Sequence, residues 1–553
     1  MTAAVKEIPP VWTTGWTEEL STGTWRSATP VHQERPSPCR NACPAGGEIP
    51  FWIRQAREGQ YHLAWLTLVA QNPFPAVTGR VCHHPCEGLC NRGEYDGAVA
   101  INALEQFIGD MALREGWPLP GPEAIKDTRV AVVGSGPAGL SCAYQLRRRG
   151  YRVTVFESQP EPGGVMRYGI PAYRLPKEVV AGEIDRLLAA GIELCAGAAV
   201  RGEELALMRR EYVALCLATG ASRAKGLPQF DAAGGRVLSG LEFLGGVNRN
   251  SIPAIGRQVA VIGGGSVAMD VARTARRLGS QVRVLALEDR RSLPAQDREV
   301  QEALEEGVII RDGVMVREVA EEGGGLNLTC VRVVLDNSAL PGVLRPIVIP
   351  GVSFTVYADT VILAVGQDPD LEGFPVSRDH VGLVEVDRFQ STSGAGIFAC
   401  GDAASNERFI SAAIGGGKLA ARGMERFIEG RGGDVGVTAD AVEVSFKEIN
   451  TFYFPIAPRA EKKAVDPGMR LRDFREVRLA LSEGEALSQA DRCFSCGHCL
   501  KCDNCYYYCP DLAVIREPSP DKSYGIEDRY CKGCGLCVEE CPRGAVVLKE
   551  VRR

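Results

Sequence analysis

The sequence predicts a multidomain α/β protein, and three features of its 553 residues support this prediction. Two segments, beginning at Thr128 and Gln258, each have the pattern of a strand, a Gly-rich turn and a helix. Short apolar strands that end in glycine follow them, which is typical of parallel sheets covered by helices. Cysteines gather near both ends of the chain, and a chain of this length allows roughly three to five domains.

Composition excludes several classes of partner. The net charge of −6 gives no reason to expect nucleic acid or an anionic membrane surface. No apolar run approaches the roughly 20 residues that span a bilayer. Residues 1–16 lack the charged and then apolar layout of a signal peptide. We therefore expect a cytoplasmic protein that binds neither nucleic acid nor a membrane.

The distribution of the 20 cysteines indicates bound metal. Five lie between Cys39 and Cys90 and ten between Cys493 and Cys541. Reducing compartments disfavour disulfides, so clustered cysteines there point to metal ligands. The five others are expected to be small buried residues with no close pair and hence no dithiol site; they are Cys142, Cys195, Cys216, Cys330 and Cys400.

The first Gly-rich turn predicts a dinucleotide site. Gly134, Gly136 and Gly139, with Pro137 and Ala138 between them, follow an apolar strand and open a helix. Glycines let the backbone approach a pyrophosphate, and the helix N-terminus attracts its charge. Glu157 ends the next strand, where a carboxylate accepts hydrogen bonds from ribose hydroxyls.

The second turn repeats this layout and predicts a nicotinamide dinucleotide site. Its fingerprint residues are Gly263, Gly265, Ser266 and Ala268, and its second strand ends near Glu288. A carboxylate there favours the free 2′-hydroxyl of NAD. Arg290 and Arg291 follow and could instead bind the 2′-phosphate of NADP, so we expect NAD and keep NADP as the alternative. Two such folds suggest one FAD and one nicotinamide.

The motifs EPGGVMRYGIPAYRLPKEVV and GIFACGDAA, together with both fingerprints, resemble the small subunit of glutamate synthase and its relatives. These relatives include the N-terminal half of dihydropyrimidine dehydrogenase and the large subunit of electron-bifurcating ferredoxin:NADP oxidoreductase. The resemblance covers about residues 35–430. It implies FAD at the first site and a nicotinamide domain inserted into the FAD domain. Asp402 then matches the residue that hydrogen-bonds the FAD ribityl chain. The segment Gly415–Ala421 matches the helix start that faces the flavin. Further cofactor contacts are expected from Gly164, Arg174, Ala218, Thr219, Gly220, Gly366, Gly401 and Gly416.

The N-terminal cysteines have iron–sulfur spacings. The resemblance implies one [4Fe–4S] cluster held by Cys43, Cys82, Cys86 and Glu105. A second cluster in the relatives uses an upstream CxxC pair with the equivalents of Cys39 and Cys90. This chain has TPVHQERPS in that place, whereas Cys493 and Cys496 stand in an RCxxCG segment near the other end. We hypothesise that these two cysteines complete the second cluster; otherwise Cys39 and Cys90 are spare thiols.

The tail predicts a bacterial ferredoxin unit. Two CxxCxxCxxxCP runs stand in tandem, and in that arrangement the fourth cysteine of each run ligates the other cluster. One cluster would use Cys499, Cys502, Cys505 and Cys541, and the other Cys531, Cys534, Cys537 and Cys509. Zinc is the alternative. The total expected is three to four [4Fe–4S] clusters.

These features give six predicted segments. They are a helical iron–sulfur domain (1–120), the FAD domain in two parts (121–255 and 371–440), an inserted Rossmann-like NAD(P) domain (256–370), a linker (441–490) and an α+β ferredoxin domain (491–553).

The inventory predicts an oxidoreductase subunit that relays electrons between NAD(H) and a partner enzyme. No separate catalytic base is expected, because hydride passes between nicotinamide and flavin. The segment SYGIEDRYCKGCGLCVEECPRGAV resembles the ferredoxin-like subunit of 2-oxoacid:ferredoxin oxidoreductases. This favours a thiamine-diphosphate 2-oxoacid oxidoreductase as partner. The alternatives are a glutamate synthase small subunit, an NADH:ferredoxin reductase that feeds another reductase, and a redox-silent scaffold.

Overall fold

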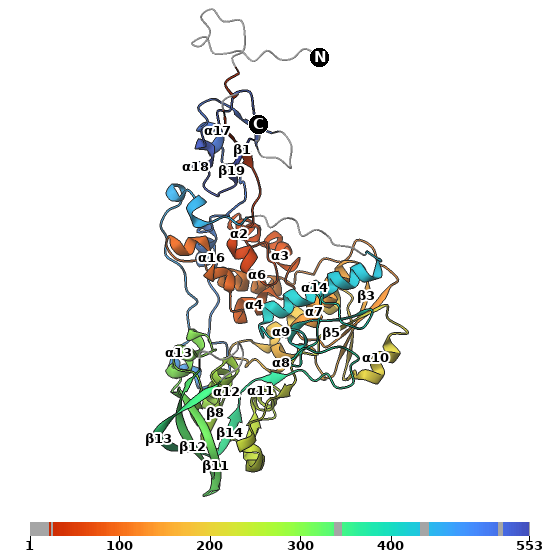
Figure 1. Cartoon of the computed structure of the whole chain (residues 1–553), viewed down its shortest axis with the longest axis vertical. Helices are drawn as coiled ribbons and strands as arrows, with labels where there is room; N and C mark the ends of the chain where they lie inside the picture. Colours follow the sequence, from red (N-terminus) through yellow and green to blue (C-terminus); the bar gives the residue numbers. More distant parts are fainter. Residues whose placement is uncertain (1–20, 24–25, 337–344, 432–441, 518–523, 552–553) are drawn as a thin grey trace, which may run out of the picture.

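The structure is a computed structural model that describes residues 21–23, 26–336, 345–431, 442–517 and 524–551. The start of the chain, on which the signal-peptide expectation depends, lies outside these ranges, as do parts of the predicted second FAD segment and linker. Figure 1 shows the cysteine-rich C-terminal unit at one end of the long axis and the second nucleotide-binding unit at the other. The N-terminal helices and the first parallel sheet lie between them.

The N-terminal unit is a small helical domain, as predicted. Residues 49–69 form two helices rather than one, because Gly59 between them takes a left-handed conformation with φ of +73°. The longest helix ends at Gly116 (φ +66°), a left-handed cap that satisfies the last carbonyls. The helices are α1 (Pro38–Ala42), α2 (Ile49–Arg57), α3 (Tyr61–Val69), α4 (Pro75–Val81), α5 (Pro85–Gly88), the short η3 (Asn91–Glu94) and α6 (Ile101–Glu115).

The first nucleotide-binding unit is built on a five-stranded parallel sheet of order β16-β5-β2-β3-β4. Its central strands are apolar on both faces because helices cover the sheet. The strands are β2 (Arg129–Val133), β3 (Arg152–Glu157), β4 (Glu193–Ala196), β5 (Ala214–Leu217) and β16 (Ile397–Ala399). The helices are α7 (Pro137–Arg148), α8 (Val165–Tyr168), α9 (Lys177–Ala189), α10 (Gly202–Met208), η5 (Gly401–Ala403) and α14 (Ile410–Ile428).

A second parallel sheet, of order β10-β9-β8-β14-β7, forms the inserted unit. Two antiparallel crossing segments, β6 (Arg223–Ala224) and β15 (Gln367–Asp368), mark where the chain leaves and re-enters the first unit. The strands are β7 (Val237–Ser239), β8 (Gln258–Ile262), β9 (Gln281–Leu285), β10 (Ile309–Arg311) and β14 (Thr360–Leu363). The helices are η4 (Pro228–Arg236), α11 (Gly240–Asn248), α12 (Ser266–Arg277) and α13 (Asp297–Glu305), and an antiparallel sheet contains β11 (Val314–Glu322), β12 (Gly325–Leu335) and β13 (Pro346–Ala358).

Strand β7 shifts the predicted domain boundary. We expected the inserted domain to begin at residue 256, but Val237 in β7 pairs with Val361 in β14 of the second sheet. The inserted unit therefore begins just after β6. The sequence pattern missed this because β7 is only three residues long.

The segment predicted as a linker contacts three units. Arg478 pairs with Glu302 of α13 at 2.7 Å, and Glu476 pairs with Arg80 of α4 at 2.8 Å. Val477 N donates to Tyr173 O of the first nucleotide unit at 2.9 Å. Its short elements are η6 (Phe446–Glu448), η7 (Thr451–Tyr453), α15 (Pro467–Arg470) and α16 (Glu483–Asp491). This segment fastens the helical and nucleotide-binding units together.

The C-terminal unit has the predicted α+β character but includes a strand from the start of the chain. Its own elements are α17 (Asn504–Tyr507), β17 (Val514–Arg516), β18 (Tyr524–Ile526), α18 (Leu536–Glu539) and β19 (Val546–Glu550). Strand β1 (Ala28–His32) pairs antiparallel with β19. Strand pairing of the two ends of the chain was not predicted.

Candidate redox cofactor sites

The first Gly-rich loop is tight on one side and open on the other. A Cβ on Gly139 would lie 1.9 Å from Gly134 O, and one on Gly134, whose φ is +102°, would lie 2.3 Å from Ala218 O. A Cβ on Gly136 would meet no protein atom within 4 Å. The loop therefore closes on the strand behind it and leaves open space at Gly136, where a pyrophosphate fits.

Glu157 lies at the edge of this open space. The carboxylate accepts hydrogen bonds from Ser135 N (2.9 Å) and Gln159 N (2.7 Å). Gly164 comes so close that an added Cβ would lie 2.8 Å from Gly136 Cα. These contacts put the three predicted contact residues Gly136, Glu157 and Gly164 around one loop.

The other predicted FAD contacts come from β5 and from the two helical segments beside α7. Gly416 lies against Gly401, because its Cβ would be 3.5 Å from Gly401 N. Asp402 follows, with Arg408 at 3.7 Å, and burial raises the pKa of its carboxyl group. After β5 comes the predicted run Ala218, Thr219 and Gly220, in which the buried Thr219 Oγ1 has no hydrogen-bond partner within the described residues. This unpaired hydroxyl in the loop after β5 fits a site that receives a polar ligand.

The helix that faces this site starts earlier than the sequence suggested. We expected the helix start at Gly415, but α14 begins at Ile410. The positive end of the helix dipole is confined to the first turn, so it lies at Ile410 and not at Gly415. The glycines serve close packing instead. A Cβ on Gly415 would lie 2.2 Å from Pro44 O, and one on Gly417 would lie 2.1 Å from Ala138 O.

The second Gly-rich loop has the same two sides. A Cβ on Gly263 (φ +132°) would lie 2.4 Å from Ala364 O, whereas one on Gly265 would meet no protein atom within 4 Å. Ser266 and the buried Ala268 begin α12, and Gly366 follows β14 with φ of +106°. The buried Glu288 lies against this loop, since a Cβ on Gly264 would be 2.8 Å from its Oε2. Arg290 and Arg291 are exposed beside it.

Arg174 links the two nucleotide-binding units. Its guanidinium pairs with Asp270 of α12 at 2.6 Å and with Glu299 of α13 at 2.5 Å. Arg174 thus makes ion pairs across the domain boundary, and the cofactor contact expected of it stays a prediction.

The first cysteine group lies beside the first nucleotide site and contains Cys43, Cys82, Cys86 and Glu105. Burial raises the pKa of Cys86, and Cys43, Cys82 and Glu105 are close enough to raise it further. Desolvation raises the pKa of Glu105 to about 7, and Asn72 Nδ2 donates to its Oε1 at 2.9 Å. The contact of Pro44 with Gly415 places this group next to Gly416.

The second group joins the two ends of the chain. Cys39, Cys90, Cys493 and Cys496 line one cavity, together with Ile49, Ile53 and Phe494. Asn91 Nδ2 donates to Cys496 Sγ at 3.5 Å, and Ser37 Oγ lies 3.2 Å from Cys39 Sγ. The four cysteines named in the hypothesis therefore lie together in the structure, and their ligation of one cluster stays a prediction.

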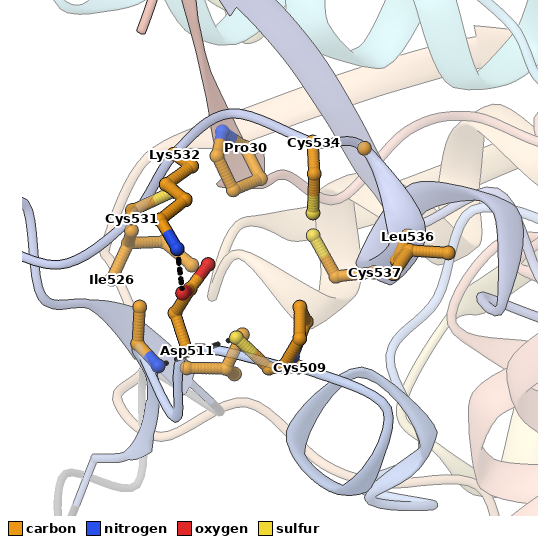
Figure 2. Close-up of a pocket in the computed structure, with 13 residues that line it drawn as sticks. Pro30, Cys509, Asp511, Ile526, Cys531, Lys532, Cys534, Leu536 and Cys537 are labelled. Atoms are coloured by element: carbon orange, nitrogen blue, oxygen red, sulfur yellow. Dashed lines mark hydrogen bonds and ion pairs between the residues drawn. The ribbon is translucent and has the colours of Figure 1, made fainter. Parts of the chain in front are cut away.

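The ferredoxin unit contains two more groups, in each of which three cysteines of one run lie near the fourth cysteine of the other run. Figure 2 shows Cys509 together with Cys531, Cys534 and Cys537 around one cavity, beside an ion pair between Lys532 and Asp511 at 2.7 Å. In the other group, burial raises the pKa of Cys505 to about 12, and nearby Cys499, Cys541 and Cys502 raise it as well.

Each of the four groups has at least one sulfur that accepts a backbone N–H. The pairs are His84 N to Cys82 Sγ (3.2 Å), Ser495 N to Cys493 Sγ (3.4 Å), Ala545 N to Cys541 Sγ (3.3 Å) and Ala513 N to Cys509 Sγ (3.3 Å). Such bonds stabilise thiolate ligands of iron–sulfur clusters. Among the described residues, no group of three or more His, Cys, Asp or Glu side chains is arranged to hold a single metal ion.

Two expectations about the remaining cysteines are wrong. Cys216 and Cys400 form a close pair, with their sulfurs 3.5 Å apart, because β5 and β16 are neighbours in the sheet. Both side chains are fully buried, and the two sulfurs form no disulfide bond. Cys195 is exposed, although we expected a buried side chain.

Comparison with known families decides the class. Residues 128–417 match the family described as "Pyridine nucleotide-disulphide oxidoreductase". The chain belongs to this family. Residues 26–117 match "Dihydroprymidine dehydrogenase domain II, 4Fe-4S cluster", and residues 525–547 match "4Fe-4S binding domain". The predicted fold class and the predicted FAD, NAD(P) and [4Fe–4S] cofactors are confirmed.

Three relatives are similar over most of the chain. The NADP(+)-dependent formate dehydrogenase subunit beta of Moorella thermoacetica is 33% identical over 83% of this chain and 70% of its own length. The NADPH-Fe(3+) oxidoreductase subunit beta of Geobacter sulfurreducens is 32% identical over 83% of this chain and 75% of its own length. The glutamate synthase small chain of Azospirillum brasilense is 35% identical over 71% of this chain and 86% of its own length.

The predicted resemblance to the glutamate synthase small subunit is thereby confirmed. The chain is an NAD(P)H-dependent flavin and iron–sulfur oxidoreductase of the electron-transfer subunit type, and partner subunits are expected because these relatives are themselves subunits. Within the described part of the chain, no helix has the length and apolar character needed to cross a membrane.

Proposed function

We propose that this chain carries electrons between NAD(H) and a partner enzyme through four [4Fe–4S] clusters that follow one another in space. The observation that supports this order is the way in which neighbouring cysteine groups share short segments. Cys39 lies on α1 and Cys43 is the residue directly after its end, so the two belong to different groups but are only four residues apart, about 6 Å along a helix. Cys496 and Cys499 also belong to different groups, and three residues span at most about 11 Å.

The two ferredoxin groups are close to each other as well. Cys537 of one group is near enough to Cys505 of the other to raise the pKa of its thiol, although burial is the main cause. The proposed order is therefore flavin site, Cys43 group, Cys39 group, Cys505 group and Cys537 group.

The protein's own residues position and insulate this relay. A bound flavin exchanges a hydride with the nicotinamide and single electrons with the clusters. Gly136 and Gly265 leave space for the two pyrophosphates, and Pro44 packs on α14 to hold the first cysteine group beside the flavin site. Arg174, through Asp270 and Glu299, holds the nicotinamide unit against the flavin unit.

For the nicotinamide we propose NAD(H), with NADP(H) as the alternative. Glu288 lies against the loop where an adenosine ribose would bind, and a carboxylate there repels a 2′-phosphate. The exposed Arg290 and Arg291 support the alternative, because both could contact such a phosphate.

For the partner we propose the catalytic subunits of a thiamine-diphosphate 2-oxoacid oxidoreductase, on the resemblance of residues 523–546. A formate dehydrogenase catalytic subunit is the second candidate, favoured by the 33% identity to a formate dehydrogenase subunit beta. Co-purification from the native source distinguishes them. The first candidate predicts that thiamine-binding chains co-purify and that NADH forms from a 2-oxo acid. NADH formation from formate would instead support the formate dehydrogenase subunit as the partner.

Anaerobic reduction tests the relay itself. On addition of NADH to the purified full chain, the flavin absorbance should bleach and the EPR signals of reduced [4Fe–4S] clusters should appear. A flavin that is reduced while every cluster stays oxidised would contradict the proposed function.

A further inference from the structure

Strand β1 comes from the N-terminal region yet forms part of the ferredoxin unit. It pairs with β19 so that Ala28 lies opposite Glu550 and His32 opposite Val546. The pairing continues at both ends, where Val551 N donates to Ser27 O (2.9 Å) and Gln33 N to Ala545 O (3.1 Å). The position of every β1 side chain is thereby fixed relative to the two ferredoxin cysteine groups.

His32, the last residue of this strand, contacts a predicted cluster ligand. Its Nε2 lies 3.5 Å from Cys505 Sγ. The ring stacks on Tyr524 with centroids 5.2 Å apart, and Tyr524 is held by a 2.7 Å hydrogen bond from its hydroxyl to Asp503 Oδ1. The buried Nδ1 has no hydrogen-bond partner among the residues that the structure describes. The ring is thus held with Nε2 towards the sulfur.

The same strand presents a different group to the neighbouring cluster site. Pro30 lines the cavity of Cys509, Cys531, Cys534 and Cys537. Proline has no N–H to donate. Cys505 and Cys537 are the third cysteines of their two equivalent runs, so β1 offers a hydrogen-bond donor to one site and an apolar ring to the other.

We propose that His32 donates a hydrogen bond from Nε2 to the Cys505 thiolate and so raises the reduction potential of the cluster held by Cys499, Cys502, Cys505 and Cys541. This inference rests on the proposed function, which assigns the cluster to these ligands. An iron-bound thiolate has no proton and only accepts, so a neutral imidazole next to it places its single N–H on that side. Hydrogen bonds to cluster sulfurs are one of the factors that set potentials, because they stabilise the more negative, reduced state. The two ferredoxin clusters would therefore differ in potential because of β1.

The test compares three single substitutions in the full chain, purified without oxygen. His32→Phe keeps a planar ring against Tyr524 but removes the donor, and His32→Gln restores an N–H donor of similar reach. Thr29→Val is the control on the same strand. The readouts are iron content and the midpoint potential of each cluster from an EPR-monitored redox titration.

The expected result is a more negative midpoint for one cluster in His32→Phe, a midpoint nearer that of the unmodified protein in His32→Gln, and no change in Thr29→Val. Unchanged midpoints in His32→Phe would overturn the inference, as would loss of about four irons per chain in both His32 variants, which would show a purely structural role. An unmodified protein with too little iron to fill the ferredoxin unit would instead overturn the ligand assignment under the proposed function.

Discussion

Asp96 and Arg492 lie 396 residues apart in the chain and 2.9 Å apart in the structure. Asp96 also forms an ion pair with Arg92 at 2.6 Å, and Arg92 in turn donates a hydrogen bond to the carbonyl oxygen of Arg492. Both arginines are 1% exposed and the carboxylate is 6% exposed. This cluster of charges fixes the residue that precedes Cys493, and so it positions the C-terminal half of the second cysteine group.

Replacing Asp96 should therefore affect stability and iron content together. Asp96→Asn leaves two buried guanidinium groups without a counter-charge, which costs about 3 kcal/mol. We expect the free energy of unfolding to fall by about that amount and the iron content to fall by about one cluster. Asp127→Asn is the control, because Asp127 is 97% exposed and its ion pair with Arg152 adds little. Equal stability and iron content in both variants would show that the ion pairs of Asp96 do not hold the segment that contains Cys493 in place.

The two sides of the first Gly-rich loop can be separated by alanine substitutions. Gly136→Ala should fold like the unmodified chain but lose FAD, because its methyl group meets only the space reserved for the cofactor. Gly139→Ala should lower the melting temperature of the apoprotein as well, since its Cβ would lie 1.9 Å from Gly134 O. Flavin absorbance after release and thermal unfolding measure the two effects. Gly235→Ala, at another glycine with no atom nearby, should change neither. Full FAD occupancy in Gly136→Ala would place the cofactor elsewhere.

The nicotinamide preference depends on the residues that follow β9. We expect kcat/KM to be higher with NADH than with NADPH. The double substitution Arg290→Ala and Arg291→Ala should lower kcat/KM with NADPH by at least about tenfold, since the loss of even one charged contact has that effect, and leave NADH nearly unaffected. Steady-state kinetics with both cofactors decide this point. A preference for NADPH that disappears in the double variant would assign the site to NADP.

Glu183 makes stability depend on pH. Burial is the main cause that raises the pKa of Glu183 to about 7, although Arg186 and the Ala76 N–H, at 2.8 Å from its Oε1, act in the opposite direction. The native state therefore binds this proton more tightly than the unfolded chain, whose glutamates titrate near about 4.3. The contribution of this group to the free energy of unfolding is fully present below the pKa of the unfolded state and is lost as the pH rises to about 7.

The corresponding test is urea unfolding at several pH values between 5 and 8. Glu183→Gln keeps an acceptor for Ala76 N but cannot titrate, so the fall in the free energy of unfolding over this interval should become smaller. Glu203→Gln, on the exposed face of α10, should leave it unchanged. An identical pH dependence in Glu183→Gln would show that another group is responsible.

The sequence allowed prediction of those features that depend on local spacing. The glycines at 134, 136 and 139 and the CxxC runs are defined by a few neighbouring residues, so their turns and groupings were predictable. The pairing of β1 with β19 was not, because two short strands at opposite ends of a chain carry no common pattern. The structural role of residues 442–482 was missed for a similar reason: their charges pair with Glu302 and Arg80 in distant units.

Distance along the chain also explains the errors at single residues. Cys216 and Cys400 are not close in sequence, and only the order of strands in the sheet brings their sulfurs together. The glycine-rich part of α14 suggested a helix start, whereas these glycines allow Pro44 and Ala138 to approach the middle of the helix.

The central claim is that one cluster, shared between the N-terminal and C-terminal regions, connects the flavin to the ferredoxin unit. The direct measurement is iron content and NADH-driven cluster reduction in the double variant Cys493→Ser and Cys496→Ser, with Cys195→Ser as control. We predict a loss of about four irons per chain, with flavin reduction preserved and reduction of the ferredoxin clusters greatly slowed. Iron content and reduction rates equal to those of the control would contradict the account.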